Sequence, residues 1–214
     1  MAGPGDSDRQ ALDRGLEALG IPARAGQCED MLSYLDELRR WNRSYNLVAA
    51  GELPHLLHRH LLDSLVIKPF VQGPRLLDVG SGAGFPGLPL AIVEPDLAVT
   101  LLDSAGKKIR FLNHVVRSLG LKNVMTVAER VENFSPAAGF STIVSRAFAT
   151  VPEFLRSVSH LARPGMRLLA MKGRHPGTEL DKLPDTVRLE SVTRLVVPGL
   201  DAERHLVVMS LQPQ

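Results

Sequence analysis

Three alternating glycines, Gly80, Gly82 and Gly84, are the residues whose spacing points most clearly to chemistry in this sequence. They follow a short apolar run at residues 76–79 that is typical of a buried strand, and they precede Pro86 and a stretch suited to a helix. Glycine accepts positive φ and has no Cβ, so a ligand can lie directly against the backbone. The following helix offers unpaired N–H groups at its start. The strand, turn and helix are therefore predicted to bind a nucleotide-like cofactor.

The spacing of the glycines separates two classes of cofactor. A dinucleotide-binding fingerprint needs G-x-G-x-x-G directly after the strand. Counted from Gly80, its third glycine falls on Phe85. Counted from Gly82 it is complete, but Gly80 and Ser81 then separate it from the strand. The pattern that fits is D-x-G-x-G-x-G from Asp78, which resembles the first motif of class I S-adenosylmethionine (SAM)-dependent methyltransferases. We interpret the turn as a cofactor site rather than a purely structural one.

Polar residues follow the next two predicted strands. Asp103 lies 23 residues beyond Gly80, close to the spacing at which an acidic side chain meets ribose hydroxyls. Its carboxylate could instead cap the next helix, but Ser104 can take that role, so we favour the ribose. The segment at residues 128–132, after the third strand, fits an adenine-binding loop and a solvated helix start equally well.

Basic and aromatic residues follow the fourth and fifth strands. Arg146 comes directly after a buried strand and so points into the mouth of the site, where burial requires an anionic or polar partner. Phe148 offers a ring on which a base can stack. Lys172 and Arg174 form a basic cluster that suits phosphates, although a solvated surface also accounts for them.

The elements that must position these residues form an α/β pattern. From residue 75 onward strands alternate with helices, which indicates a parallel sheet. Seven strands are expected, at residues 76–79, 98–102, 123–127, 142–145, 166–171, 188–196 and 205–211. Helices are expected at residues 86–93, 105–119, 151–161 and 177–182, the last being the weakest. Doubly wound sheets bind ligands at the carboxyl ends of their strands, which is where the polar residues above lie.

The first 70 residues are predicted to be helical. Disorder is expected at residues 1–6, followed by a helix from an N-cap at Ser7 to Leu19 and by helices at 27–43 and 54–64. We therefore divide the chain into a helical extension, residues 1–70, packed on a catalytic domain, residues 71–214. The third helix carries histidines, but their spacing is not that of a metal-binding pair, and no metal site is expected.

The composition is that of an ordinary soluble globular protein. Of the 214 residues, 44% are hydrophobic and 22% are charged, and 25 basic and 23 acidic residues leave a net charge of +2. That balance permits a nucleic-acid partner without requiring one. Cys28 is the only cysteine, so no intramolecular disulfide can form. No signal peptide or membrane-spanning run is visible, and we expect a cytoplasmic protein.

Short segments spread over most of the chain carry a more specific resemblance. They lie at residues 41–42, 45–47, 59–64, 77–87, 103–104, 107–112, 130–132, 145–149 and 172–173. Together they are similar to the glucose-inhibited division protein B family, the bacterial 16S ribosomal RNA (rRNA) guanine-N7 methyltransferases. The segments at 60–64 and 145–149 are particular to this family rather than to methyltransferases at large. One departure is Val48-Ala49-Ala50, where the family often has a hydroxyl residue.

The resemblance implies a Rossmann-like class I methyltransferase fold, with a seven-stranded, mostly parallel sheet, helices on both faces and an antiparallel last strand. It implies SAM as the cofactor and 16S rRNA, free or in a small-subunit particle, as the substrate of an enzyme that we expect to be a monomer. Together with Gly82 of the turn, the expected cofactor contacts are Gly80, Phe85, Asp103 on the ribose, Val131, Glu132 and Arg146. Arg146 is also the one catalytic candidate.

The implied reaction needs few catalytic groups. Guanine N7 carries an in-plane lone pair, so it can attack a sulfonium methyl group without losing a proton, and no general base is required. Catalysis would rest on alignment and electrostatics. Because the methylated base gains positive charge, cations should hold phosphates at the rim rather than crowd N7. The candidate RNA-binding residues are Arg39, Arg40, Arg43, Arg59, Lys172 and Arg174.

Two other functions compete with this interpretation. An NAD-dependent oxidoreductase would use Gly82, Gly84 and Gly87, but the glycine register disfavours it and no proton relay is evident after the fourth strand. An RNA-binding adaptor on an inactive methyltransferase fold is the alternative without catalysis. The intact glycines and Asp103 argue against it.

Overall fold

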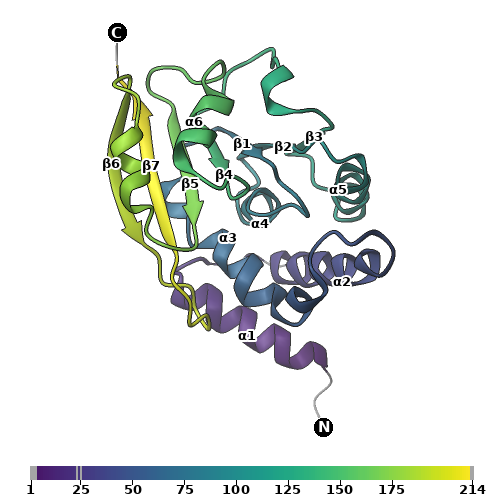
Figure 1. Ribbon diagram of the computed structural model, residues 1–214. Helices are drawn as coiled ribbons and strands as arrows, with labels where there is room; N and C mark the ends of the chain where they lie inside the picture. The colour runs from purple at the N-terminus through teal and green to yellow at the C-terminus, as the bar shows by residue number, and fades with distance from the viewer. Residues whose placement is uncertain (1–3, 23, 25, 213–214) are drawn as a thin grey trace.

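The computed structural model describes residues 4–22, 24 and 26–212, which form a seven-stranded sheet flanked by helices (Figure 1). The strands are β1 (Arg75–Val79), β2 (Ala98–Leu102), β3 (Val124–Val127), β4 (Thr142–Ser145), β5 (Arg167–Lys172), β6 (Val187–Arg194) and β7 (His205–Leu211). Their order in the sheet is β3-β2-β1-β4-β5-β7-β6. Strands β1 to β5 pair in parallel, whereas β7 is antiparallel to β5 and β6. The predicted methyltransferase sheet, including its antiparallel last strand, is confirmed.

The inner strands are the apolar runs of the sequence. All four residues of β4 and the last four of β1 are buried, because helices cover both faces of the sheet. By contrast, β6 is largely exposed, and its pairing with β7 shifts register between Leu189 and Ser191. The limits of β6 are set by that pairing, so it ends at Arg194 and not at residue 196 as predicted.

The helices differ from the prediction mainly at their ends. They are α1 (Pro4–Ala18), α2 (Gln27–Tyr45), α3 (Asp63–Leu65), α4 (Gly87–Val93), α5 (Gly106–Ser118) and α6 (Val151–Val158). Helix α1 begins at Pro4, so an N-cap at Ser7 and disorder at residues 4–6 are wrong, while residues 1–3 lie outside the described residues. Proline suits a first helical turn because its missing N–H would have no partner there.

The segment predicted as one helix at residues 54–64 consists of three short helical pieces. A 3₁₀-helix spans Ala50–His55, a π-helix spans Leu57–Leu62, and α3 follows directly. A π-helical turn is rare and is found mostly near functional sites. The last predicted helix, Gly177–Lys182, is likewise a 3₁₀-helix.

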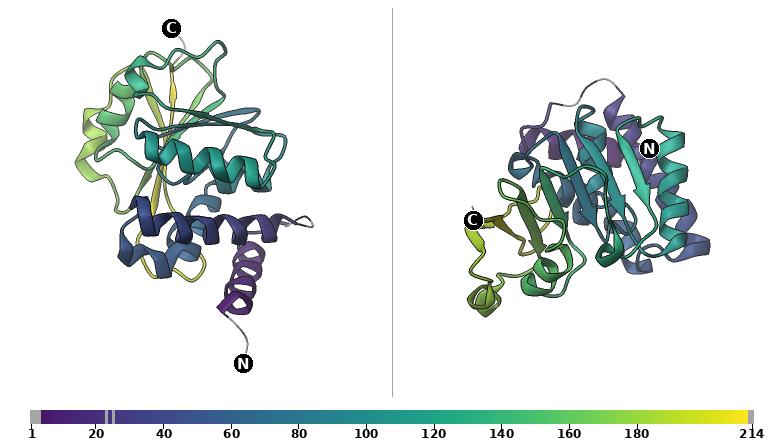
Figure 2. Two further views of the ribbon diagram at one scale, coloured as in Figure 1. Left: turned by 90° about the vertical axis from the view of Figure 1, so that its right-hand side faces the viewer. Right: turned by 90° about the horizontal axis from the view of Figure 1, so that it is seen from above.

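Each face of the sheet has its own apolar core. On one face, Leu76, Leu101 and Val144 pack with residues of α1 to α5. On the other face, Leu77 and Ile143 pack with residues of α6. All seven residues of α4 are buried, because α4 lies between the sheet and the N-terminal helices α2 and α3 (Figures 1 and 2). The helices of residues 1–70 therefore share a core with the sheet.

Across the described residues, no helix combines the length and the apolar character needed to cross a membrane.

Candidate active site

The glycine turn after β1 has the backbone geometry that its sequence predicts. Gly80, Gly82 and Gly84 have φ values of +70°, +61° and +110°. A Cβ on Gly80 would lie 2.6 Å from the Cβ of Ala147, and one on Gly84 would lie 2.5 Å from Leu88 Cδ1. A Cβ on Gly82 would meet only the Gly80 carbonyl oxygen, at 3.9 Å. Gly80 and Gly84 therefore allow close packing, whereas Gly82 faces open space that a ligand can occupy.

Asp103, at the end of β2, holds this turn in place. Its side chain is almost fully buried, and Oδ2 accepts a hydrogen bond of 2.9 Å from the Gly82 backbone N–H. The same oxygen lies 3.2 Å from Lys108 Nζ, and Oδ1 accepts from the Ala105 N–H at 2.8 Å, just before α5. Helix α5 has no side-chain cap hydrogen bond, so Ser104 does not take the capping role expected of it, and Asp103 bonds the N-cap residue Ala105 instead. Its carboxylate thus joins the glycine turn to α5.

A cavity of about 280 Å³ lies over the carboxyl ends of β1, β2 and β3. It brings together four of the predicted cofactor contacts, Gly80, Asp103, Val131 and Glu132, and is completed by Val79, Leu102, Ser104, Lys108, Glu129, Arg130, Ala147 and Phe148. The loop after β3 contributes Glu129, Arg130, Val131 and Glu132 to the cavity wall and forms a short 3₁₀-turn at Val131–Asn133, while the adenine contact stays a prediction.

Phe85, also predicted to contact the cofactor, is not among the residues that line this cavity. Its side chain is 3% exposed, and its ring centroid lies 5.3 Å from that of Tyr34 and 5.1 Å from that of His60. The Arg146 guanidinium carbon lies 5.4 Å from the same ring. The Phe85 side chain therefore packs against Tyr34, His60 and the Arg146 guanidinium. Only the backbone of Phe85 is part of the glycine turn.

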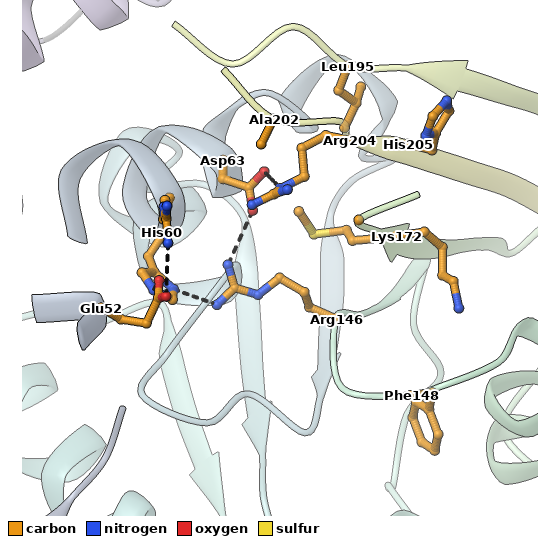
Figure 3. A pocket seen from close by; sticks show the side chains of 13 residues that line it. Glu52, His60, Asp63, Arg146, Phe148, Lys172, Leu195, Ala202, Arg204 and His205 are labelled. Carbon is orange, nitrogen blue, oxygen red and sulfur yellow. Dashed lines mark hydrogen bonds and ion pairs between the residues drawn. The ribbon is translucent and has the colours of Figure 1, made fainter. Parts of the chain in front are cut away.

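A second cavity, of about 620 Å³, lies over the ends of β4, β5 and β7 (Figure 3). Phe148 lines both cavities, so they adjoin at this residue. The larger cavity is lined by Glu52, Arg59, His60, Asp63, Arg146, Phe148, Met171, Lys172, Gly173, Leu195, Ala202, Arg204 and His205. Strand order reverses between β1 and β4, and the two cavities lie on either side of that switch point, where doubly wound sheets bind ligands.

Arg146 is held by side chains from distant parts of the sequence (Figure 3). Its NH1 donates to Asp63 Oδ2 at 3.3 Å, and its NH2 donates to His60 Nδ1 at 3.0 Å. Asp63 is 2% exposed, and its other oxygen accepts from Arg204 Nε at 2.9 Å. His60 Nε2 lies 3.1 Å from Glu52 Oε2. Arg146 is half-buried, and the polar partner predicted for it is a network that joins the end of β4 to the N-terminal helices.

Burial shifts the pKa values of two members of this network. It lowers the pKa of His60 to about 4, and the nearby Arg146 guanidinium acts in the same direction. Burial raises the pKa of Asp63 above its ordinary value, although Arg204 and Arg146 oppose that shift. At neutral pH, His60 is therefore uncharged and can accept a hydrogen bond from a cation.

Asp78 is a second buried carboxyl group, beneath the glycine turn. It is fully buried, and Oδ2 accepts from the Gly87 N–H at 2.8 Å, while Oδ1 has no hydrogen-bond partner in the part of the chain that the structure describes. Burial raises the pKa of Asp78 to about 7, even though the Gly87 N–H and Arg146 favour the carboxylate. This residue of the D-x-G-x-G-x-G pattern fixes the start of α4.

The structure brings only two of the six predicted RNA-binding residues to the larger cavity, Arg59 and Lys172. Arg59 pairs with Glu52 at 3.1 Å, and Lys172 pairs with Glu179 at 3.1 Å and donates to the Ala149 carbonyl oxygen.

The other four cations lie outside this cavity. Arg39 pairs with Asp8 and Asp36, and Arg40 pairs with Glu37. Arg43 and Arg174 have no ion pair within the described ranges. The six residues therefore do not form one rim, because α2 carries its arginines toward α1 and α5.

Sequence analysis missed five polar residues of the larger cavity, Glu52, His60, Asp63, Arg204 and His205. Asp63 and His60 lie in one of the two segments most particular to the family resemblance, which was the available indication. Arg204 precedes β7 in a loop without a recognisable pattern, and only the fold brings it to Asp63. Among the described residues, no group of three or more His, Cys, Asp or Glu side chains is arranged to hold a metal ion.

The residues present fit SAM. Gly82 offers open space against bare backbone, and Asp103 presents a carboxylate at the wall of the adjoining cavity. The loop at residues 129–132 closes the far side of that cavity. These features fit the two parts of SAM, an adenosine whose ribose carries a vicinal diol and a zwitterionic methionine portion.

Comparison with known proteins gives a family match over most of the chain. A family model described as rRNA small subunit methyltransferase G (GidB) matches residues 27–207. The ribosomal RNA small subunit methyltransferase G of Alkalilimnicola ehrlichii is 49% identical over 203 residues, covering 95% of this chain and 92% of the relative. That of Serratia proteamaculans is 46% identical over 202 residues, covering 94% and 98%.

Solved structures share the fold at much lower identity. A SAM-dependent methyltransferase from Aquifex aeolicus is similar with a TM-score of 0.57 and 22% identity, over 74% of this chain and 94% of that chain. TrmN from Thermus thermophilus is similar with a TM-score of 0.56 and 19% identity, over 73% and 53%. These likenesses concern the arrangement of the sheet and helices.

Proposed function

The chain belongs to the rRNA small subunit methyltransferase G (GidB) family and is a SAM-dependent rRNA methyltransferase, and from this premise we propose how its two cavities divide the reaction. SAM binds across the glycine turn with its adenosine in the smaller cavity. A guanine of 16S rRNA enters the larger cavity and receives the methyl group on N7. The observation that supports this division is that the cavities adjoin at Phe148, beside the switch point of the sheet.

The cofactor roles follow from the positions of the lining residues. Gly80 and Gly82 offer bare backbone to the cofactor, and Asp103 accepts hydrogen bonds from the ribose hydroxyls. Because the Asp103 oxygens already accept from backbone N–H groups, the ribose would share a carboxylate that is fixed in position. Val131 and Glu132 contact the adenine from the loop after β3.

The larger cavity suits a nucleotide that becomes positively charged. SAM supplies a methyl group on a sulfonium centre, and the N7 lone pair accepts it without loss of a proton. The cavity wall holds four cations, Arg59, Arg146, Lys172 and Arg204, and two carboxylates, Glu52 and Asp63. The excess of cations attracts the phosphates of the target nucleotide. Because the Asp63 carboxylate offsets part of the positive charge of Arg146 and Arg204, repulsion of a guanine that gains positive charge there is reduced.

No described residue is needed as a general base, which agrees with the chemistry of N7. Arg146, in the wall of the larger cavity, is the residue that we propose acts on the reaction, by orienting the base and shaping the local potential. We further propose that the enzyme works as a monomer in the cytoplasm, where 16S rRNA is available free or in small-subunit particles.

Methyl transfer to a defined atom tests this proposal. The purified protein would be incubated with methyl-labelled SAM and, in parallel, with a 16S rRNA transcript and with small subunits from cells that lack the enzyme. We expect label at one guanine, at a position where reduction and aniline treatment then cleave the chain, as N7-methylguanine does. Label on another base, or label that leaves the chain resistant to cleavage, would contradict the assignment of N7.

A further inference from the structure

We propose that His60 and Asp63 are positioning residues for methyl transfer, which together hold the Arg146 guanidinium in the wall of the larger cavity. This inference rests on the proposed function, which puts Arg146 next to the reacting base. It gives a role to the segment at residues 60–64, which the sequence analysis singled out without assigning one. That segment and the one at 145–149 are the two most particular to the family resemblance, and they meet here.

The guanidinium is held from three directions (Figure 3). Asp63 Oδ2 accepts from NH1 at 3.3 Å, and His60 Nδ1 accepts from NH2 at 3.0 Å. The Phe85 ring lies against the guanidinium, 5.4 Å from its central carbon. Two hydrogen-bond acceptors on different nitrogens and a ring on one face fix both the location and the plane of the group.

The local backbone explains why two side chains three residues apart reach the same guanidinium. His60 lies in the π-helix Leu57–Leu62, and Asp63 follows it directly at the start of α3. Both residues come from the N-terminal helical region, whereas Arg146 follows β4, 83 residues beyond Asp63. The pairing therefore orients a group at the end of the sheet from outside the sheet.

The hydrogen bonds require one tautomer of His60. A guanidinium has only donors, so Nδ1 of His60 must carry a lone pair and accept from Arg146. The proton then lies on Nε2, which donates to Glu52 Oε2 at 3.1 Å. Glu52 is thus the group that selects the tautomer, and the lowered pKa of His60 keeps the ring neutral at neutral pH.

Besides positioning Arg146, Asp63 offsets positive charge near the reacting base. Its carboxylate bridges Arg146 and Arg204, with 2.9 Å between Oδ1 and Arg204 Nε. Without this carboxylate, two guanidiniums would face a base that becomes positive during methylation. Asp63 therefore fixes Arg146 and offsets the charge that would oppose the reaction.

A matched pair of substitutions at His60 tests the positioning role. The oxygen of Asn occupies the place of Nδ1, so His60→Asn keeps an acceptor for Arg146, whereas His60→Gln places its amide near Nε2 and keeps only the contact toward Glu52. Single-turnover methylation of small subunits would be measured at saturating SAM. We expect a loss of tenfold or more in the rate constant for His60→Gln and a clearly smaller loss for His60→Asn. Equal losses, or a larger loss for His60→Asn, would overturn the proposal.

A double-mutant cycle separates this inference from the proposed function itself. Arg146→Ala alone should slow methyl transfer; if it does not, the proposed role of Arg146 fails whatever His60 does. If it does, His60→Gln should have little further effect in the Arg146→Ala background, because the group that it positions is gone. Losses that multiply would show that His60 acts independently of Arg146 and would overturn the positioning role. SAM affinity and the melting temperature, measured for each variant, should stay close to those of the wild type.

Asp63→Asn provides a second, independent arm. It keeps an acceptor for one guanidinium and removes the negative charge shared by Arg146 and Arg204. We expect a slower single-turnover rate with SAM affinity within about twofold of the wild type. An unchanged rate constant in a folded Asp63→Asn variant would overturn the part of the proposal that concerns Asp63.

Discussion

The three glycines of the turn after β1 all adopt positive φ, but the space around them differs. All three that alternate in the pattern have positive φ, but only Gly82 faces open space, while Gly80 and Gly84 face Ala147 and Leu88. A side chain on Gly80 or Gly84 would therefore disturb packing first. Gly82 is the position at which cofactor binding can be tested with least damage to the fold.

We predict that Gly82→Ala abolishes or strongly weakens SAM binding while lowering stability by only about 1 kcal/mol, the cost of a left-handed conformation for alanine. The matched control is Gly120→Ala, since Gly120 has φ +64° and equally open surroundings, but lies at the end of α5. Calorimetric titration with SAM and thermal unfolding would be measured for both variants. Equal SAM affinity in the two variants would show that the space beside Gly82 is not the cofactor's.

Side-chain partners were the part of the site that the sequence could least predict. That Arg146 needs a polar partner follows from its position after a buried strand, but the partners, His60 and Asp63, lie more than 80 residues away. In the same way, charge alone suggested that Arg39 and Arg40 bind RNA, while the fold pairs them with Asp8, Asp36 and Glu37. Such pairings depend on the docking of helices.

At the scale of elements, α2 supports the glycine turn through a buried hydrogen bond. The fully buried Tyr34 hydroxyl donates to the Ala83 carbonyl oxygen at 2.7 Å, and its ring packs on Phe85 and Phe111. Burial raises the pKa of Tyr34, so it remains a donor throughout the working pH range. A helix of the N-terminal extension thus fixes the backbone of the cofactor site.

We predict that Tyr34→Phe lowers the free energy of unfolding by about 1–3 kcal/mol, because the buried Ala83 carbonyl loses its donor. SAM affinity should fall as well, since the turn becomes less fixed. Tyr45→Phe is the control on the same helix, because Tyr45 is 38% exposed and its hydroxyl has no hydrogen bond among the described residues. Denaturant unfolding and SAM titration would be compared, and identical results for the two variants would contradict a supporting role for Tyr34.

The sequence predicted helices and strands well where the apolar residues follow one regular pattern along the whole element. Strands β2, β4 and β7 match their apolar runs residue for residue, and α2 and α5 follow their helical periodicity to within two residues at either end. The segment from Ala50 to Leu65 was predicted less well, because 3₁₀-, π- and α-helical turns follow one another there without a common period. That segment is also the one that holds Arg146.

At the scale of the whole molecule, the buried Asp78 makes stability depend on pH. Its pKa is raised from 3.8 to about 7, so between these values the folded state binds the proton and the unfolded state does not. The free energy of unfolding therefore falls, through this group, as pH rises toward 7. Asp78→Asn keeps an acceptor for the Gly87 N–H but cannot ionise.

We predict that the stability of Asp78→Asn relative to the wild type increases by about 2 kcal/mol between pH 5 and pH 8. The measurement is denaturant unfolding of both proteins across that range. Asp185→Asn, at an exposed carboxylate without an ion pair in the described ranges, should show no such trend. A difference between Asp78→Asn and the wild type that stays constant with pH would mean that Asp78 does not carry the shifted pKa.

The division of the chain at residue 70 can be tested at the same scale. Every residue of α4 is buried, and much of its cover comes from α2 and α3. The cores of these helices and of the sheet face are continuous, and each buried leucine contributes about 1.5–3 kcal/mol. Loss of several such contacts exceeds the about 5–15 kcal/mol that stabilises a domain. The N-terminal helices are in this view part of the catalytic unit, not a separable domain.

We therefore predict that a fragment comprising residues 71–214 does not unfold cooperatively and does not bind SAM. The matched control is a fragment comprising residues 26–214, which lacks α1 and the segment after it that contains the buried Ile21, and still holds the whole segment matched by the family model, residues 27–207. Because α1 contributes few buried residues, among them Leu12 and Leu16, this control should remain folded with reduced stability. Circular dichroism during heating and SAM titration would be measured for both fragments. Cooperative unfolding of residues 71–214 with SAM affinity close to that of the full chain would show instead that the sheet and its own helices suffice.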